Sequence, residues 1–271
     1  MSYYQSLGLE KEPFSTSPDP AFLFRSAGHS AVLNRLEIAI RLRRGLGLIL
    51  GDVGIGKTTI LRALIQEFSQ EQDFIFHMIL DPDYNSEFQL LESLAKRFKI
   101  VPNSRTTHDY REEIEKYLFK QGVEENKTIV LLIDEGQKLA ANHLEVLRTL
   151  LNYETNEYKL LQLAIMGQME LLPKVKKIKN FYDRVALRYI INPLDEAETG
   201  QMIDFRLKTA GLASGRSLFS PESIRLIFRY TEGYPRKIAL VCHNALEELI
   251  IRNKQIVDET LVSQVIKRED I

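Results

Sequence analysis

The sequence is poor in cysteine and tryptophan: Cys242 is its only cysteine, and it has no tryptophan among 271 residues. A single cysteine cannot form a disulfide within the chain, and it argues against a cysteine-based metal site. Cys242 lies in the stretch KIALVCHNALEELI, where apolar residues recur at helical spacing. We therefore expect a buried structural thiol in a helix.

Long apolar runs and an excess of one charge are also missing. No apolar run approaches the roughly 20 residues that a membrane span needs, and the first residues lack the basic and apolar stretches of a secretory signal. We therefore expect a cytoplasmic protein. The formal net charge is −1, so any nucleic-acid site would have to be a local patch of basic residues.

The length and composition indicate a folded protein with more than one domain. Hydrophobic residues make up 44% and charged residues 27% of the 271 positions, close to the averages of soluble globular proteins. A chain of this length favours one large α/β domain and one smaller domain.

The first two thirds of the chain alternate between apolar strands and amphipathic helices. Strands are expected at 46–50, 74–80, 128–134, 160–167 and 186–192, and helices at 31–45, 58–68, 86–98, 108–122 and 142–154. The strand at 128–134 shows no polar alternation, and the regular alternation of strands and helices predicts a parallel sheet with helices on both faces.

The pattern changes after Pro193. Four helices are expected there, at 195–211, 220–233, 235–253 and 258–269, with start and stop signals such as Ser220-Pro221 and Gly233. We expect a domain boundary near Asn192, followed by a small all-helical domain.

The stretch GDVGIGKTT follows the first expected strand and precedes a helix. Gly51, Gly56, Lys57 and Thr58 satisfy the pattern G-x-x-x-x-G-K-[ST] of the phosphate-binding loop, or Walker A motif. In such a loop, backbone N–H groups surround phosphate oxygens, the lysine reaches the β- and γ-phosphates, and the threonine hydroxyl binds Mg²⁺. The expected nucleotide-binding residues are Gly51, Asp52, Val53, Gly54, Ile55, Gly56, Lys57, Thr58 and Thr59.

A second motif, IVLLIDEGQ, ends a buried strand in Asp134 and Glu135. A carboxylate at such a place is costly to bury unless a cation or a hydrogen-bond donor faces it. We expect Asp134 to hold Mg²⁺ together with Thr58, and Glu135 to polarise the attacking water as general base. A glycine-rich turn with a merely solvated lysine would leave this acid pair unexplained, so ATP and Mg²⁺ are the expected cofactors.

The nucleotide and the reaction can be narrowed further. A guanine-specific protein would need Asn-Lys-x-Asp after a strand, but Asn126-Lys127 is followed by Thr128-Ile129 and precedes its strand. GTP is therefore disfavoured. Glu135, as a second acid placed to activate water, favours hydrolysis over phosphotransfer.

Three arginines complete the set of motifs. NFYDRVALRY places Arg184 and Arg188 before and within the last strand, and TEGYPRKIAL places Arg236 at the start of a helix. The motifs occur in an order that resembles that of AAA+ ATPases. This order is the Walker A loop, the strand with its acid pair (the Walker B motif), LQLAIMGQMEL, the arginine pair and EGYPRK. The leader YYQSLGLEKEPFSTSPDPAFLFRSAGH is similar to that of the ExeA/GspA branch, which includes the MshM pilus-biogenesis ATPases and is related to the transposition ATPases TnsC and TniB.

The resemblance implies further catalytic roles. Gln168 falls at the sensor-one position, which senses the γ-phosphate or orients water. Arg236 matches sensor two and is expected to bind the nucleotide by contacting phosphate from the lid. Arg184 matches the arginine finger that acts on the ATP of a neighbouring subunit, with Arg188 as the other candidate. If so, the protein is a homo-oligomer, as a ring or a filament, and the monomer is a poor ATPase.

The resemblance also implies a division of the chain. Residues 1–28 form an N-terminal strap, residues 29–192 the AAA+ domain and residues 193–271 a helical lid. The part of the strap from Asp19 to Phe24 is expected to pack near the adenine, the alternative being a strap that only covers the core.

The sequence departs from the family at two places. ExeA and GspA proteins typically continue into a transmembrane segment and a peptidoglycan-binding domain, whereas this sequence stops at Ile271. It is either a cytosolic member without these parts or a piece of a longer protein, so a wall-binding role is not transferred. The stretch PKVKKIKNFYDR is expected as an exposed loop whose lysines are Lys174, Lys176, Lys177 and Lys179. Repeated in each subunit of an oligomer, such a patch would bind DNA with a steep salt dependence.

Three functions stay open. The first is an ATP-hydrolysing switch in type II secretion or pilus biogenesis, cytoplasmic or peripheral at a bacterial inner membrane, with secretion or pilus assembly proteins as partners. The second is an ATP-dependent transposition regulator with duplex DNA and a transposase as partners. The third is a protein in which the nucleotide is only a structural ligand.

Overall fold

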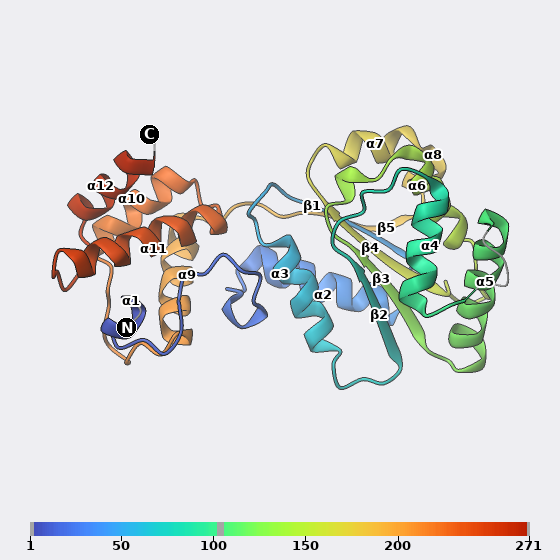
Figure 1. Cartoon of the computed structure of the whole chain (residues 1–271), viewed down its shortest axis with the longest axis horizontal. Coiled ribbons are helices and arrows are strands. Elements are labelled where there is room, and N and C mark those ends of the chain that lie inside the picture. Colours follow the sequence, from blue (N-terminus) through green and yellow to red (C-terminus); the bar gives the residue numbers. More distant parts are fainter. Residues whose placement is uncertain (1–2, 102–105, 270–271) are drawn as a thin grey trace. The chain divides into compact units, whose positions relative to one another are not determined.

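The computed structural model describes residues 3–101 and 106–269, and Figure 1 shows their helices and strands. The outermost residues of the predicted strap and lid, 1–2 and 270–271, lie outside this part. The strands are β1 (Leu46–Leu50), β2 (Phe74–Ile79), β3 (Thr128–Ile133), β4 (Leu161–Gly167) and β5 (Val185–Ile190). The helices up to β5 are α1 (Tyr3–Ser6), η1 (Pro20–Phe22), α2 (Ala27–Arg41), α3 (Lys57–Glu67), α4 (Glu87–Phe98), α5 (Thr107–Phe119), η2 (Lys120–Glu124), η3 (Gly136–Lys138), α6 (Ala141–Leu150), α7 (Leu171–Lys177) and α8 (Lys179–Tyr182). After β5 come α9 (Glu196–Thr209), α10 (Pro221–Thr231), α11 (Pro235–Ile251) and α12 (Glu259–Glu269).

The strands form one parallel sheet with the order β2-β3-β4-β1-β5. Within it, Leu46 at the start of β1 pairs with Leu163 of β4 on one side and with Val185 of β5 on the other. Parallel neighbours need long crossover connections, which the helices between the strands provide. The predicted P-loop α/β fold is confirmed.

Helices cover both faces of the sheet. On one face, Leu46, Leu48 and Leu50 of β1 belong to an apolar cluster that also contains buried residues of α4, α5 and α6. On the other face, a Cβ placed on Gly47 would lie 3.3 Å from Leu36 Cδ2 of α2. Because successive strand residues point to opposite faces, an apolar strand such as β1 is buried on both sides.

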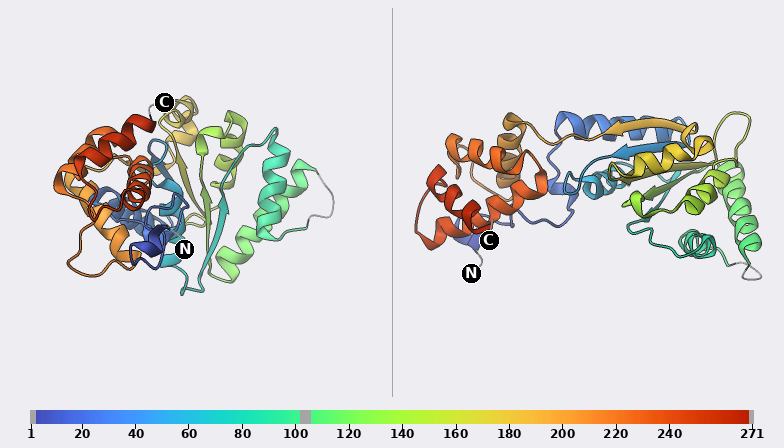
Figure 2. Two further views of the ribbon diagram at one scale, coloured as in Figure 1. Left: turned by 60° about the vertical axis from the view of Figure 1, so that its left-hand side comes forward. Right: turned by 90° about the horizontal axis from the view of Figure 1, so that it is seen from above.

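The last four helices build a second apolar core. Cys242 of α11 is fully buried in it, as predicted, and burial raises the pKa of its thiol. Leu7, Leu9, Phe14 and Phe22 of the N-terminal segment belong to the same core, and this segment lies against helices α9 and α11 (Figure 2). The N-terminal segment therefore covers this core, and its contact with adenine stays a prediction.

The chain divides into two compact units. A helical unit comprises residues 1–29, 54–59 and 192–271, and a sheet unit comprises residues 30–53 and 60–191. The division into a strap (1–28), an AAA+ domain (29–192) and a lid (193–271) stays a prediction. Within residues 3–101 and 106–269, no helix is long and apolar enough to cross a membrane.

One predicted loop is wrong. The lysine-rich stretch before Arg184 folds into helices α7 and α8. Leu171 and Val175, four residues apart on one face of α7, are fully buried, so apolar burial makes the stretch helical. Lys174, Lys176, Lys177 and Lys179 are nevertheless exposed, as predicted.

Candidate nucleotide-binding site

The predicted phosphate loop connects β1 to α3, and its glycines have the backbone that such a loop requires. Gly54 has a φ of 81° and Gly56 a φ of 103°, in the region that glycine adopts without a steric penalty. Lys57 is the first residue of α3 and is 6% exposed. The N-terminus of α3 directs N–H groups and a positive partial charge toward this loop, which suits a phosphate.

Two other segments of the helical unit contact the outside of this loop. The N–H of Arg236 donates to the Gly54 carbonyl at 3.1 Å, and a Cβ placed on Gly54 would lie 2.8 Å from Arg236 Cβ. The structure therefore brings the predicted sensor-two residue beside the phosphate loop. His29, which the sequence patterns did not single out, bonds through Nε2 to the Ile55 carbonyl at 2.9 Å.

The predicted acid pair lies at the carboxyl edge of the sheet. Asp134 follows β3, is 2% exposed, and donates its N–H to the Ile79 carbonyl at 2.8 Å. Gly51, the first loop residue after β1, donates its N–H to the carbonyl of Gly167 at 3.1 Å, directly before Gln168. The carboxyl ends of β1, β3 and β4 thus bring Gly51, the acid pair and Gln168 to one edge.

Gln137 connects two of the predicted catalytic residues. Its Nε2 donates to Glu135 Oε2 at 2.6 Å, and its Oε1 accepts from the Gln168 N–H at 3.1 Å. Gln137 is 5% exposed, and Glu135 has a positive φ of 51°, a strained backbone for a residue with a side chain. Sequence reasoning missed Gln137, although its position in the motif IDEGQ was a usable signal.

The finger candidate Arg184 lies at the opposite edge of the sheet from the acid pair. It directly precedes Val185, which pairs with Leu46 at the start of β1, whereas the phosphate loop follows the end of β1. The length of a five-residue strand, about 16 Å, therefore separates the two edges. Near Arg184, burial and the positive charge of this arginine lower the pKa of Lys159.

The other finger candidate, Arg188, contacts an aromatic side chain of its own unit. Its guanidinium lies 4.7 Å from the centre of the Tyr182 ring and donates to the Tyr182 hydroxyl at 2.5 Å.

The chemistry of the two predicted magnesium ligands suits MgATP. Thr58 offers a hydroxyl and Asp134 a carboxylate, both hard oxygen donors of the kind that Mg²⁺ prefers. In the described part of the chain, no group of three or more His, Cys, Asp or Glu residues could hold a metal by itself.

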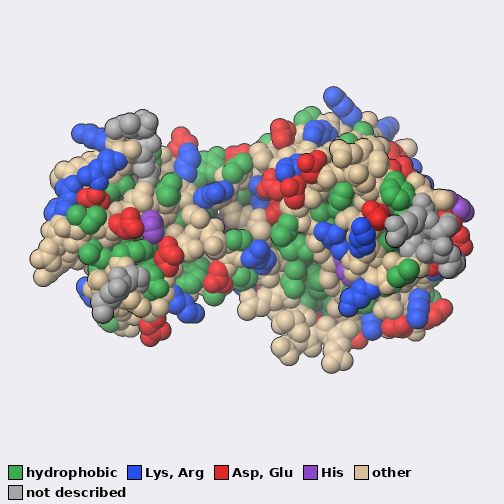
Figure 3. All heavy atoms as spheres, viewed as in Figure 1, with side chains coloured by type: hydrophobic (Ala, Val, Ile, Leu, Met, Phe, Trp, Pro, Cys, Tyr) green, Lys and Arg blue, Asp and Glu red, His purple; other side chains and the backbone are tan. Residues whose placement is uncertain are grey.

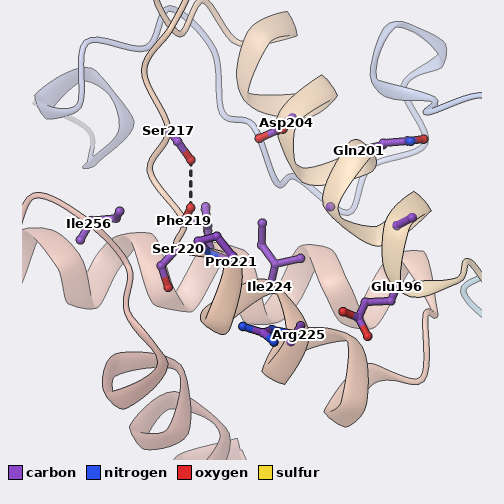
Figure 4. Close-up of a pocket in the computed structure, with 12 residues that line it drawn as sticks. Glu196, Gln201, Asp204, Ser217, Phe219, Ser220, Pro221, Ile224, Arg225 and Ile256 are labelled. Carbon is purple, nitrogen blue, oxygen red and sulfur yellow. Dashed lines mark hydrogen bonds between the residues drawn. The ribbon is translucent and has the colours of Figure 1, made fainter.

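An open groove of about 850 Å³ lies elsewhere in the helical unit (Figure 4). Its lining includes Phe219, Pro221 and Ile224, with Glu196 of α9 and Arg225 of α10. None of the predicted site residues lines this groove, so it is separate from the candidate nucleotide site.

Three comparisons with known proteins bear on this site. A family profile described as "AAA domain" matches residues 40–175, which is just over half of the chain. General secretion pathway protein A of Aeromonas hydrophila is 32% identical over 246 residues, which cover 90% of this chain and 44% of that protein. The chain therefore spans less than half the length of that relative.

Solved structures show the same fold at lower identity. The Aeropyrum pernix ORC2 protein, in ADPNP–ADP complexes, has a TM-score of 0.71 and 16% identity, covering 96% of this chain and 71% of that one. The Drosophila ORC bound to DNA has a TM-score of 0.69 and 21% identity, covering 96% of this chain and 65% of that one. With the family profile and the identity to general secretion pathway protein A, these findings show that the chain belongs to the AAA domain family and is an ExeA/GspA-like AAA+ protein.

Proposed function

We propose that this protein binds MgATP at the phosphate loop and hydrolyses it with Glu135 as general base. The observation that carries the proposal is the sheet edge at which Gly51, Asp134, Glu135 and Gln168 meet, because hydrolysis needs a phosphate site and a base together. The AAA domain match supports the same reaction.

Each residue has a separate task in the proposed reaction. Lys57 places its charge at the β- and γ-phosphates, and Glu135 accepts the proton of the attacking water. Gln137 holds the Glu135 carboxylate through a 2.6 Å hydrogen bond, which limits the directions in which that carboxylate can accept a proton. Thr58 and Asp134 would hold Mg²⁺, which neutralises phosphate charge when bound.

We also propose that Arg184 completes the site of a neighbouring subunit. Its position at the amino edge of the sheet supports this, because the acid pair of the same chain lies at the carboxyl edge. A positive charge delivered by a second subunit would stabilise the negative charge on the transferred phosphoryl group. Hydrolysis would then depend on ATP-driven assembly of a homo-oligomer.

The similarity to general secretion pathway protein A supports a role in type II secretion or in the assembly of a related pilus. In this role the partners are secretion or pilus assembly proteins, and the protein acts in the cytoplasm, at the inner membrane.

The reaction is tested by comparing ATP binding and phosphate release in three variants. We expect Lys57→Ala to weaken binding of MgATP, and Glu135→Gln to keep binding but lower turnover at least about 10²-fold, the range for loss of a general base. Glu124→Gln, which makes the same change at an exposed glutamate, is the matched control. Unchanged turnover in both site variants would refute the assignment, and measured turnover in the wild type would exclude a purely structural nucleotide.

The second candidate function is ATP-dependent binding of duplex DNA by a transposition regulator. The specific observation in its favour is the row of exposed lysines on α7 and α8, including Lys176 and Lys177. On the face shown in Figure 3, both basic and acidic side chains are spread over the surface, so a DNA site would be local. Its test is ATP-dependent DNA binding by the Glu135→Gln variant.

A further inference from the structure

His29 is a buried histidine with both ring nitrogens in hydrogen bonds. It lies on α2, is 2% exposed, and bonds through Nε2 to the Ile55 carbonyl at 2.9 Å and through Nδ1 to Ser26 Oγ at 2.7 Å. These three residues all belong to the helical unit. The bond to Ile55 joins a side chain of the N-terminal segment to the backbone of the phosphate loop.

The partners determine which nitrogen carries the proton. A carbonyl oxygen can only accept, so Nε2 must carry the hydrogen that points at Ile55. Nδ1 of the neutral ring then accepts from the Ser26 hydroxyl, while Ser26 Oγ itself accepts from the His29 N–H at 3.3 Å. Burial lowers the pKa of His29, which favours this neutral form.

The bond to Ile55 also orients the next N–H of the loop. The Ile55 carbonyl and the Gly56 N–H belong to one peptide group, and in a planar trans peptide the two point in opposite directions. No peptide bond of the described chain is cis. With the carbonyl held toward His29, the Gly56 N–H is directed to the opposite side of the loop.

The preceding peptide group is held in the same way. The Gly54 carbonyl accepts from the N–H of Arg236 at 3.1 Å. The Ile55 N–H of the same peptide group therefore points away from Arg236. Two successive N–H groups of the phosphate loop are thereby oriented from outside the loop. Successive N–H groups arranged in this way form a concave site for an anion.

The His29 ring leaves little room for a side chain at Gly56. A Cβ placed on Gly56 would lie 3.3 Å from His29 Nε2, so the ring packs closely behind the loop. Glu198 of α9 accepts from the N–H of Ala27 at 3.1 Å, next to Ser26. A hydrogen bond from α9 thus reaches the chain between Ser26 and His29.

We propose that His29 is a positioning residue of the nucleotide site, which holds the Ile55–Gly56 peptide so that the Gly56 N–H faces a bound phosphate. The proposal rests on the proposed nucleotide binding. It predicts that the hydrogen-bond donor at the Nε2 position, and no other property of the ring, sets the affinity for phosphate-bearing nucleotides.

The test compares two amide replacements of equal polarity. The amide nitrogen of His29→Gln can take the place of Nε2, whereas that of His29→Asn reaches only to the position of Nδ1. We expect the affinity for a fluorescent MgADP analogue to fall about tenfold in His29→Asn, the effect of one lost hydrogen bond, and to stay within about twofold of wild type in His29→Gln.

Two further measurements keep the test decisive. The thermal unfolding midpoint shows whether each variant folds. Ser26→Ala removes the donor to Nδ1 together with the acceptor of the His29 N–H, and it should weaken MgADP binding by about two- to threefold. Equal affinities in folded His29→Asn and His29→Gln would overturn the proposal. If His29→Asn does not fold, an unchanged affinity in Ser26→Ala would overturn it.

Lys57→Ala separates this proposal from the proposed function. If Lys57→Ala abolishes MgADP binding while His29→Asn binds like wild type, only the role of His29 is wrong. If Lys57→Ala also binds like wild type, the nucleotide site itself is wrong.

Discussion

At the residue scale, His77 shows how burial and neighbouring charges change the protonation of a side chain. It lies on β2 with its ring centre 4.6 Å from that of Phe98, and its Nε2 is 3.3 Å from the Tyr117 hydroxyl. Burial, followed by the positive charges of Arg97 and Lys99, lowers the pKa of His77 to about 4. The folded protein therefore keeps this ring neutral at a pH where the unfolded chain protonates it.

This difference predicts that stability falls in acid. Above about pH 6.5, His77 is neutral in both the folded and the unfolded protein, and its full contribution to the free energy of unfolding is present. As the pH falls from 6.5 toward 4, the unfolded chain takes up the proton first, and the free energy of unfolding drops. After allowance for partial exposure, we expect His77 to account for roughly 2 kcal/mol of that loss.

The measurement is urea unfolding at several pH values in wild type and His77→Gln. Burial also lowers the pKa of His29 and His143, so only the difference in the free energy of unfolding between the two proteins reports on His77. The free energy of unfolding of wild type minus that of His77→Gln should fall as the pH falls from 6.5 to 4. A constant difference across this range would show that His77 is not responsible.

At the element scale, α7 is a short helix that buries one face and exposes its lysines. Leu171 and Val175 are fully buried, whereas Lys176 and Lys177 are exposed. Lys174 differs from them, because its Nζ donates to the Gln137 carbonyl, beside the catalytic network. A test of the lysines should therefore change Lys176 and Lys177 and leave Lys174 intact.

The prediction for DNA binding belongs to this helix. If the second candidate function holds, Glu135→Gln protein with ATP binds labelled duplex DNA with a steep salt dependence. Adding Lys176→Glu and Lys177→Glu should then make the slope of log affinity against log salt less steep, by about 2 for each subunit in contact. Fluorescence anisotropy across a salt series measures this slope.

A matched control makes the same charge change elsewhere. Lys96→Glu with Lys120→Glu reverses two exposed lysines of the sheet unit on other elements, and it should leave the slope unchanged. An equal loss in both double variants would indicate a general charge effect. No DNA binding at low salt would remove this function and leave the secretion role.

At the scale of the whole molecule, the proposed reaction needs two chains. Lys57 would serve the nucleotide of its own chain, whereas Arg184 would serve that of a neighbour. Lys57→Ala and Arg184→Ala should each be inactive alone. Mixed together, they should recover part of the wild-type rate, because some contacts pair an intact ATP site with an intact arginine.

The control for this mixture is a pair of variants with defects in the same site. Lys57→Ala mixed with Glu135→Gln should stay inactive, because neither chain has a complete ATP site. Recovery in this control as well would refute action between subunits. Recovery with Arg188→Ala but not with Arg184→Ala would make Arg188 the finger.

Much of the fold was predictable because its signals are local. The strand predicted at 46–50 matches β1, and the helix predicted at 86–98 matches α4 to within one residue. Helix ends were less predictable: α2 ends at Arg41 and not at Gly45, because Arg43 has a left-handed backbone and its Nε donates to Thr128 Oγ1. A contact 85 residues away in the chain leaves no local pattern.

The sequence by itself determined the class of the fold and the chemistry of the motifs, since the periodicity of apolar residues and the spacing of Gly56, Lys57 and Thr58 are properties of short segments. Only the tertiary structure decided which of these segments meet. The pairing of β5 with β1 places Arg184 at the edge opposite the acid pair, and the packing of α2 places His29 behind Ile55. These contacts depend on strand register and on packing between distant segments, which no short stretch of sequence encodes.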